Sequence, residues 1–564
     1  MEKIKVLALG GLDEEGKDLY CIEINDDIFV INCGYKHPTR FTPGIDFIIS
    51  DFSYLKENKD RIVAYIIPKN KRKHFGALPY IYKDCPAPIY CTDLTKIFFL
   101  KFASDYKQEN NFDIHTLLLP TRINIHGHNV DFFSTCSSVP SSFGFSISTE
   151  HGNIVFSGDF IVEYNNTKDF YFDLNTIGKI SEKPTLLLMC DSTNANKTGY
   201  CSPNNRLTPH LEKYFKHAPG RIFIAFSHDN FYHLHEILKV CNAFNKKIAF
   251  YDDVTKNAYD LSNNLYEANK LFPKANIINT EDILRIKENS LVILICDTKE
   301  KLYEKVSLLA NNEHESKLIR LTPNDTFIMA CTPNDNNEVI FTSTIDDLYR
   351  SGSRVEYLTT KNLVAMHAYE EDIRMLLSLL KPKYYFPIEG YYVNLLANAM
   401  IAFDMNLNLS HNNIFLLDNG QTLEIEDGTA KVDFNNDGHI KIGDVMIDGI
   451  GVGDVVNEII NDRTRLSDDG VIILGCGVSL KEKKITYGPD VQMRGFLFLK
   501  DKDADVILKE VTKLFVEATN KYLLESKPFV VESVQNKIND IISKYLLKQS
   551  NRNPVIKSNI IVID

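Results

Sequence analysis

The sequence has 564 residues, of which 44% are hydrophobic and 24% are charged. This size and composition are typical of a folded protein with two to four domains and a sizeable core. The net charge of −12 excludes nucleic-acid binding through an overall basic surface, so any such binding would need a local patch.

The first part of the chain alternates short β-type runs with turns. Residues 4–11, 19–24 and 27–34 predict three successive strands, with Gly10 and Gly11 at the first turn. Residues 61–68 predict another strand, and the pattern from His74 onward suits the start of a helix.

Fully apolar runs then alternate with helical stretches. The runs at 221–226, 247–251 and 291–296 are separated by patterns such as the helical one at 232–244. This alternation predicts a parallel sheet with crossover helices between about 205 and 358. A helix followed by a strand is expected over 370–390. Two amphipathic helices, at 511–525 and 534–549, precede an apolar tail.

Cysteine usage and the apolar runs bear on the cellular compartment. The 11 cysteines include no C-x-x-C pair, which argues against a zinc ribbon or a redox motif. Residues 1–11 lack the apolar stretch and cleavage site of a signal peptide, and the apolar runs are too short to span a bilayer. We therefore expect a reduced, cytoplasmic protein.

Segments spread over nearly the whole chain resemble the ribonuclease J family in order and spacing, among them LGGLDEEGKDLY, FGALPYIY, GNIVFSGDF, DSTNAN, LKPKYYFPIEG, DGIGVGDV and GPDVQMRGF. The resemblance implies an α/β fold with three parts. Residues 1–205 and 363–448 would form a metallo-β-lactamase αββα sandwich. Residues 206–362 would form an inserted β-CASP α/β domain, and residues 449–564 a linker and a small α+β C-terminal association domain.

The turn after the strand at 61–68 differs from the family at the residues that bind the metal ions. There the family carries T-H-G-H-E-D-H, whose His and Asp side chains hold two zinc- or manganese-type ions that activate the water that cuts RNA. In this chain Lys69 and Lys71 replace the two spaced His, Lys73 replaces the Asp, and His74 is kept. An ammonium group has no lone pair to offer a metal ion and repels it.

The other ligand positions that the resemblance implies are altered as well. Ser137 and Glu389 stand where the family has His ligands, while Asp159 is kept. Asn32 replaces an Asp that in the family supports the ligands without binding the metal itself. No catalytic residue is then intact, and the remnants able to hold a metal are His74, Asp159 and Glu389. We therefore expect no metal cofactor.

The three lysines of the turn have an expected orientation. In the family the ligand positions point into the cavity, which places these lysines inward and Asn70 and Arg72 outward. Because an unpaired buried carboxylate is costly, we expect at least one of the lysines to form a salt bridge with Asp159 or Glu389. The alternatives are a solvated charged turn and a nucleic-acid patch.

The RNA-binding motifs implied by the resemblance are eroded too. The family's H-T-S-G-H-G, which cradles a substrate phosphate, reads LVAMHA, so Leu363, Met366 and His367 are vestigial positions of that pocket. The T-G-S-Q-G-E segment reads CDTKEK at 296–301 and lacks the glycines that let backbone N–H groups approach phosphate.

Two further motifs have ordinary interpretations. Residues 433–444 fit the EF-hand loop pattern, with acidic groups at Asp433 and Asp444, but the strand-like flanks favour a plain turn over a Ca²⁺ site. His228, His233 and His235 do not match the family's ligand positions. His233 and His235 are two residues apart, so they do not share a helix face, and polar or core histidines are expected.

Three functional hypotheses follow. The first is a catalytically inactive ribonuclease J-like subunit in RNA processing and decay that partners an active ribonuclease J, or itself. The second is a metal-dependent exo- or endoribonuclease with a non-standard site. The third is an interaction protein no longer engaged with RNA. An oligomer is expected because the family's C-terminal domain supports subunit association, with the apolar faces of 511–524 and 559–564 as parts of the contact.

Overall fold

The computed structural model describes residues 2–38, 42–108, 110–163, 170–201, 207–264, 275–313, 319–333, 337–359, 362–363, 366–432, 440–449, 451–452, 457–496, 501–525 and 528–563. The chain divides into two compact units. One comprises residues 1–36 and 49–444, and the other comprises residues 37–48 and 445–564.

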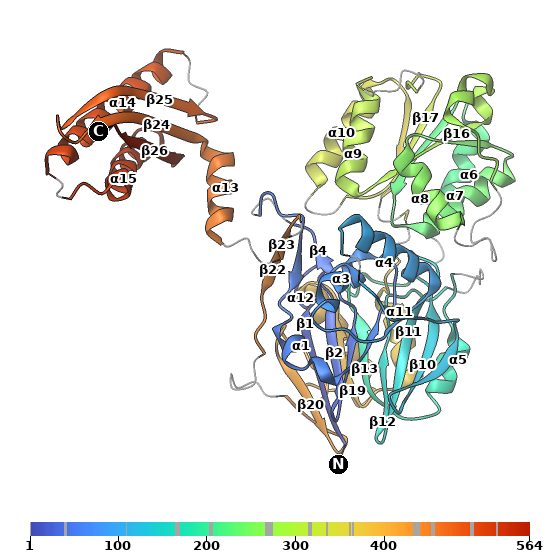
Figure 1. The fold of residues 1–564 in the computed structure, drawn as a ribbon. Helices are drawn as coiled ribbons and strands as arrows, with labels where there is room; N and C mark the ends of the chain where they lie inside the picture. The colour runs from blue at the N-terminus through green and yellow to red at the C-terminus, as the bar shows by residue number, and fades with distance from the viewer. Residues whose placement is uncertain are drawn as a thin grey trace. The chain divides into compact units, whose positions relative to one another are not determined.

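Two sheets form the base of the first unit (Figure 1). The eight-stranded sheet has the order β21 (Thr429–Val432), β20 (Thr422–Glu426), β1 (Lys3–Gly10), β2 (Leu19–Ile24), β3 (Asp27–Ile31), β6 (Ile62–Ile66), β7 (Ile89–Cys91) and β8 (Ile114–Thr116). The six-stranded sheet has the order β19 (Tyr384–Ile388), β13 (Thr185–Asp191), β12 (Gly152–Phe156), β11 (Ser142–Thr149), β10 (His128–Thr135) and β9 (Thr121–Ile125).

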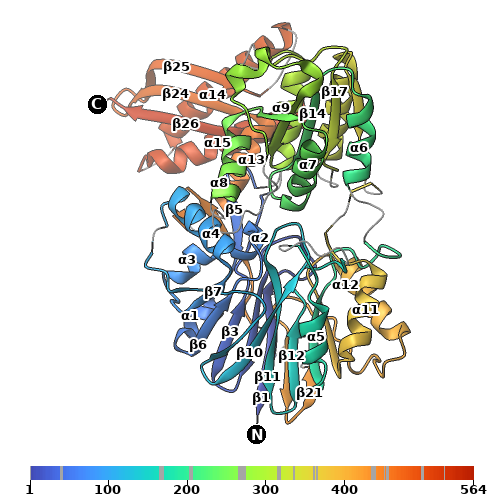
Figure 2. The ribbon, with the colours of Figure 1, turned by 90° about the vertical axis from the view of Figure 1, so that its right-hand side faces the viewer.

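Apolar side chains from both sheets meet in one core. Val6 and Tyr20 from the first sheet and Phe145, Phe156 and Met189 from the second belong to the same buried cluster. Helices cover the two outer faces (Figure 2), namely α1 (Ser53–Glu57), α2 (Arg72–Phe75), α3 (Leu78–Tyr82) and α4 (Asp93–Asp105) on one side and α5 (Leu174–Ile180), α11 (Glu370–Leu380) and α12 (Tyr392–Asp404) on the other. This is the expected αββα sandwich.

The middle of the chain forms a parallel sheet in the same unit. Its order is β15 (Lys247–Phe250), β16 (Leu291–Asp297), β14 (Ile222–Ser227), β17 (Thr326–Ala330) and β18 (Arg354–Tyr357), and every adjacent pair is parallel. The connecting helices are α6 (Leu207–His217), α7 (Phe231–Ala243), α8 (Asp253–Asn264), α9 (Lys299–Ala310) and α10 (Glu338–Arg350). This confirms the predicted parallel sheet with crossover helices. The prediction succeeded because continuous apolar runs are typical of strands that are buried on both faces.

The second unit has its own core. Its sheet has the order β25 (Lys484–Arg494), β24 (Val471–Ser479) and β26 (Val555–Val562), and its helices are α13 (Asn457–Asp469), α14 (Asp501–Glu525) and α15 (Val531–Ser550). Val511 and Phe515 of α14 and Ile538 of α15 are fully buried in this core. The inner face of α14 is therefore used within the unit itself.

Short elements complete the structure: β4 (Tyr35–Lys36), β5 (Phe47–Ser50), β22 (Asp444–Asp448), β23 (Gly451–Val452) and the 3₁₀ turns η1 (Lys59–Arg61), η2 (Thr280–Arg285) and η3 (Glu288–Ser290). The EF-hand-like stretch from Asp433 lies outside the described residues except for its last five positions, 440–444. Within the described ranges, no helix combines the length and the hydropathy that crossing a membrane requires. The predicted domain boundaries stay a prediction.

Candidate functional site

The turn after β6 is held by backbone contacts to the segment that follows β3. The N–H of Cys33 donates to the carbonyl oxygen of His74 (2.6 Å), and the N–H of Ala77 donates to that of Cys33 (2.8 Å). A Cβ atom at Gly34 would lie 1.4 Å from the carbonyl oxygen of Lys73. The turn therefore runs so close to Gly34 that no side chain fits there.

Lys69 is buried in this turn and pairs with a buried carboxylate. Its side chain is 2% exposed and forms an ion pair with Asp159, whose side chain is fully buried. Burial opposes ionisation, yet Lys69 and Lys73 together hold the pKa of Asp159 well below its usual range. Burial lowers the pKa of Lys69 to about 8 against the opposing attraction of Asp159. The predicted salt bridge is therefore present.

Lys73 lies among three carboxyl groups. Its Nζ is 3.3 Å from Glu389 Oε2, 3.9 Å from Asp18 Oδ2 and 3.9 Å from Asp159 Oδ2. Burial, followed by the nearby charge of Asp159, raises the pKa of Glu389 well above its usual range. Burial also raises the pKa of Asp18 to about 7. Burial and mutual repulsion thus favour the protonated forms of Glu389 and Asp18, whereas the two lysines favour the ionised form of Asp159.

Lys71 takes a different direction from its two neighbours. Its Nζ is 3.1 Å from Asp229 Oδ2 in the loop after β14. The N–H of Lys71 donates to the carbonyl oxygen of Lys69 (2.9 Å), and this tight turn breaks the alternation of an extended chain. The expectation that Lys71 faces the cleft carboxylates is therefore wrong. Asn70, expected to face outward, is buried, whereas Arg72 is exposed.

His74 and His367 bring neutral imidazoles to the same cleft. His74 lies 3.6 Å from Asp18 Oδ2 and 3.8 Å from Asp159 Oδ2, and burial lowers its pKa to about 3. His367 Nδ1 is 2.8 Å from Asp191 Oδ2, its Nε2 is 3.6 Å from Asp159 Oδ2, and burial lowers its pKa as well. A neutral imidazole keeps a lone pair that a metal ion can use.

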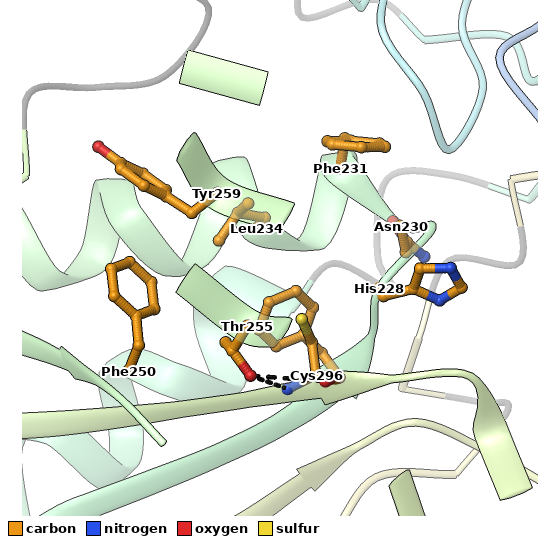
Figure 3. A pocket seen from close by; sticks show the side chains of 9 residues that line it. His228, Asn230, Phe231, Leu234, Phe250, Thr255, Tyr259 and Cys296 are labelled. Atoms are coloured by element: carbon orange, nitrogen blue, oxygen red, sulfur yellow. Dashed lines mark hydrogen bonds between the residues drawn. The ribbon is translucent and has the colours of Figure 1, made fainter. Parts of the chain in front are cut away.

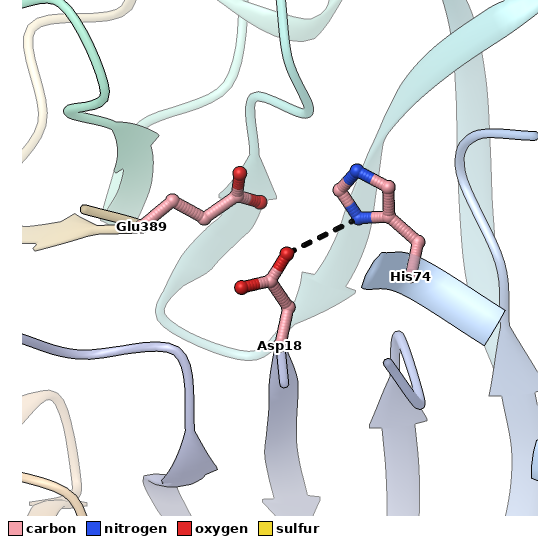
Figure 4. Close-up of side chains that lie close together, drawn as sticks. All are labelled: Asp18, His74 and Glu389. Carbon is pink, nitrogen blue, oxygen red and sulfur yellow. Dashed lines mark ion pairs between the residues drawn. The ribbon is translucent and has the colours of Figure 1, made fainter. Parts of the chain in front are cut away.

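These side chains form two buried groups of metal-type donors. In each group one ligand atom per residue lies within 4.8 Å of the others, and the groups are Asp18, His74 and Glu389 (Figure 4), and Asp159, Asp191 and His367. Carboxylate oxygen and imidazole nitrogen suit zinc- and manganese-type ions.

Comparison with known proteins matches two parts of the chain to family descriptions. Residues 219–348 match "Ribonuclease J, beta-CASP domain", and residues 458–563 match "Ribonuclease J C-terminal domain". Curated proteins named "Ribonuclease J 2" match nearly the full chain. The Streptococcus pyogenes protein is 29% identical over 563 residues and 99% of each chain, and the Staphylococcus aureus protein is 27% identical over 557 residues, 98% of this chain and 97% of its own.

The chain thus contains stretches that match the β-CASP and C-terminal domains of ribonuclease J, and it is similar to ribonuclease J 2 proteins over nearly its full length. A solved structure of an Enterococcus faecalis protein of unknown function aligns with a TM-score of 0.51 and 13% identity, covering 75% of this chain and all of its own. At that identity the likeness concerns the fold alone.

The expectation of no metal cofactor is wrong. β-CASP ribonucleases normally use metal ions, and the two donor groups are present. The sequence identified His74, Asp159 and Glu389 as possible metal ligands and placed His367 in the phosphate pocket, but it did not single out Asp18 or Asp191. A signal existed for Asp191, which ends a buried strand, as catalytic carboxylates in α/β folds do.

The donors fit an ion by type but share the cleft with ammonium groups. Among the described atoms, Asp18 Oδ2, Asp159 Oδ1 and both ring nitrogens of His74 have no hydrogen-bond partner, although they are buried. Such atoms are available to a cation. Lys69 and Lys73 already bring positive charge to Asp159, so a metal ion would compete with them.

The remaining predicted positions have lost ligand character. The hydroxyl of Ser137 is 2.7 Å from that of Ser142 in a buried pair. Leu363 and Met366, at the vestigial phosphate pocket, are buried in the apolar core. Apart from His367, which joins the second donor group, these positions do not come together as a polar site.

A second pocket lies at the carboxyl ends of β14 and β16 (Figure 3). Rings of Phe226, Phe231, Phe250 and Tyr259 line it together with polar groups of His228, Asn230, Thr255 and Cys296. Thr255 Oγ1 accepts from the N–H of Cys296 (3.1 Å). His228, His233 and His235 are not among the metal-type groups found in the described part of the chain.

Proposed function

We propose that this chain is a ribonuclease J-type subunit in RNA processing and decay that does not hydrolyse RNA itself and acts as the partner of an active ribonuclease J. The observation that carries the proposal is the buried Lys69 paired with Asp159. In two-metal hydrolysis the ions supply the activated water and stabilise the developing charge. Here an ammonium group is bound to a carboxylate of that cleft.

The rest of the cleft supports the same proposal. Lys73 contacts Glu389 and lies near Asp18 and Asp159, so both donor groups face positive charge from the protein. An ion entering either group must displace or tolerate an ammonium less than 4 Å from its ligands. The burial of Leu363 and Met366 removes polar contacts from the position of the family's phosphate pocket.

A second candidate function is hydrolysis at a non-standard metal site. It is favoured by the two donor groups and by the unpartnered ring nitrogens of His74. Both candidates keep the chain in RNA metabolism. They differ in whether the purified protein cuts RNA.

The first test is hydrolysis of single-stranded RNA with a 5′ monophosphate in the presence of Mn²⁺, Mg²⁺ or Zn²⁺. We expect no cleavage above a protein-free blank. Asp159→Ala is the matched control, because it removes the ionised carboxylate of the cleft. Cleavage by the natural chain that disappears in Asp159→Ala would favour the second candidate.

The partner role has a separate test. The tagged chain is purified from its native cell, and an active ribonuclease J is expected to copurify in stoichiometric amount. An untagged strain gives the background. Recovery of the tagged chain without a second ribonuclease J would contradict the partner role, whatever the outcome of the hydrolysis assay.

A further inference from the structure

Two hairpins, one from each sheet of the sandwich, meet at Asp27. Asp27 is the first residue of β3, at the end of the β2–β3 hairpin. In the β9–β10 hairpin, Ile125 pairs with His128, so His126 and Gly127 form a two-residue turn. Both turn residues have positive φ angles, 49° and 94°, as in the tight hairpin turns that match the twist of the strands. The hairpin thus carries one histidine at its tip and one at the start of β10.

Both imidazoles approach the same carboxylate oxygen. His126 Nδ1 and His128 Nε2 are each 2.9 Å from Asp27 Oδ2. Partial burial opposes the ionisation of Asp27, yet its hydrogen bonds with the two histidines hold its pKa below the ordinary value. Among the described residues, no ammonium or guanidinium group is paired with Asp27. This carboxylate therefore differs from Asp159, with which Lys69 already forms an ion pair.

The three side chains are of the types that bind a zinc-type ion. Imidazole nitrogen and carboxylate oxygen bind Zn²⁺ at about 2.0–2.2 Å, so neighbouring ligand atoms of a tetrahedral site lie roughly 3.3 Å apart. The two nitrogen–oxygen distances at Asp27 are already close to that spacing. The two nitrogens are not gathered as tightly as the atoms of the buried donor groups, so one ring has to turn when an ion binds. The side chain of His126 is 66% exposed and has room to do so.

The other two ligands are held in place by their surroundings. The side chains of Asp27 and His128 are only 19% and 17% exposed. The ring of His128 meets the ring of Phe29 edge-on, with centroids 5.4 Å apart. The N–H of Gly127 donates to Asn124 Oδ1 (3.0 Å), which fixes the turn. Two fixed ligands and one adjustable ligand leave the remaining coordination position open to water.

This group of side chains lies away from the cleft. Asp27 begins β3, whereas Asn32 follows the last residue of β3 and lines the cleft together with Lys69 and Asp159. Five residues of extended strand span about 17 Å. An ion at Asp27 is therefore separate from the two buried donor groups.

We propose that Asp27, His126 and His128 form a structural binding site for a zinc-type ion, which ties the hairpin ends of the two sheets together. Asp27 and His128 are 101 residues apart in the chain, so the three ligands come together only in the folded sandwich. An ion that binds only the folded chain stabilises it. This proposal goes beyond the proposed function and does not depend on it, because it involves neither RNA nor a partner.

Titration calorimetry of the purified full chain with Zn²⁺ alone tests the site. We expect the natural protein to bind one more Zn²⁺ per chain than His126→Gln/His128→Gln, and this difference excludes ions at the buried donor groups. His115→Gln is the matched control, because His115 is an exposed histidine 3.1 Å from the single carboxylate of Asp113. It should bind as many ions as the natural protein. Equal numbers for the natural protein and the double variant, or the same loss in His115→Gln, would overturn the proposal.

Urea unfolding with and without Zn²⁺ provides a second test. Zn²⁺ should raise the unfolding midpoint of the natural protein, and the rise should be smaller in His126→Gln. His126 is largely exposed, so this single variant should unfold at the natural midpoint when a chelator removes the ion. The same Zn²⁺-dependent rise in both proteins would place the stabilising ion elsewhere and overturn the proposal.

Discussion

Two regions at the carboxyl ends of strands differ in the side chains that fill them. The turn after β6 keeps its charges and buries them, with Lys69 on Asp159 and Lys73 near Glu389. The region beyond β14 and β16 is instead lined by aromatic rings, and its histidines are neutral. In the first region positive charge comes from side chains. In the second, aromatic rings and a few polar groups line a pocket.

The comparison teaches that the two regions differ in what a substitution costs. A buried charge pair is sensitive to the loss of one partner, because the other charge remains in a low-dielectric site. A packed apolar pocket responds to lost volume, and a partly exposed ion pair contributes little. The substitutions below are ordered by the expected loss in the free energy of unfolding, from largest to smallest.

The largest effect is expected in the charged cleft. Asp159→Ala should lower the free energy of unfolding by about 3–5 kcal/mol, because Lys69 stays buried without its partner. Urea unfolding of natural and variant protein measures the difference. Lys69→Met/Asp159→Leu, which removes both charges, should recover a large part of the loss. A loss below about 1 kcal/mol for the single variant would place this ion pair among the weak surface pairs.

A smaller, pH-dependent effect is expected beside the apolar pocket. Burial lowers the pKa of His233 to about 4 in the folded protein, from an ordinary value of 6.5. Below pH 6.5 the unfolded chain binds a proton that the folded one does not. Stability is therefore full above pH 6.5 and is lost as the pH falls toward 4, by up to about 3 kcal/mol.

His233→Gln isolates this contribution. The variant should show a flatter loss of stability between pH 6.5 and 4, measured by thermal or urea unfolding at several pH values. His115→Gln is the control, because His115 is an exposed histidine whose ring nitrogen faces Asp113. If stability fell in the same way with pH in the natural protein and in His233→Gln, this histidine would have the same pKa in the folded and unfolded chains.

The smallest effect is expected at Lys71. Its pair with Asp229 is partly exposed, so Lys71→Met should change the free energy of unfolding by less than about 1 kcal/mol. Lys69→Met, in the same turn, should cost several times more because it leaves the buried Asp159 short of a partner. Similar losses in the free energy of unfolding for the two variants would contradict the expected difference between the buried Lys69 and the partly exposed Lys71.

The fold was predictable because its signals are local and repeated. Apolar runs and helical periodicity specified the parallel sheet, and the family resemblance supplied the αββα sandwich. The Lys69–Asp159 pair was predictable from charge replacement at known positions. The direction of Lys71 was not, since a tight backbone turn at Lys69–Lys71 reorients it.

The grouping of the metal-type donors was not predictable, for a different reason. Asp18, Asp191 and His367 are distant in sequence and meet only in the folded chain. This grouping is a tertiary feature, so no local pattern in the sequence reveals it.

The backbone path of the turn after β6 depends on Gly34 and not on which side chains the turn carries. Its close approach to the Lys73 carbonyl and the hydrogen bonds of Cys33 fix the path of the turn through main-chain atoms alone. Residues 69, 71 and 73 can therefore be exchanged without rerouting the chain. Such a turn can accept a different chemistry, including the return of imidazole and carboxylate ligands, while Gly34 itself has almost no freedom to vary.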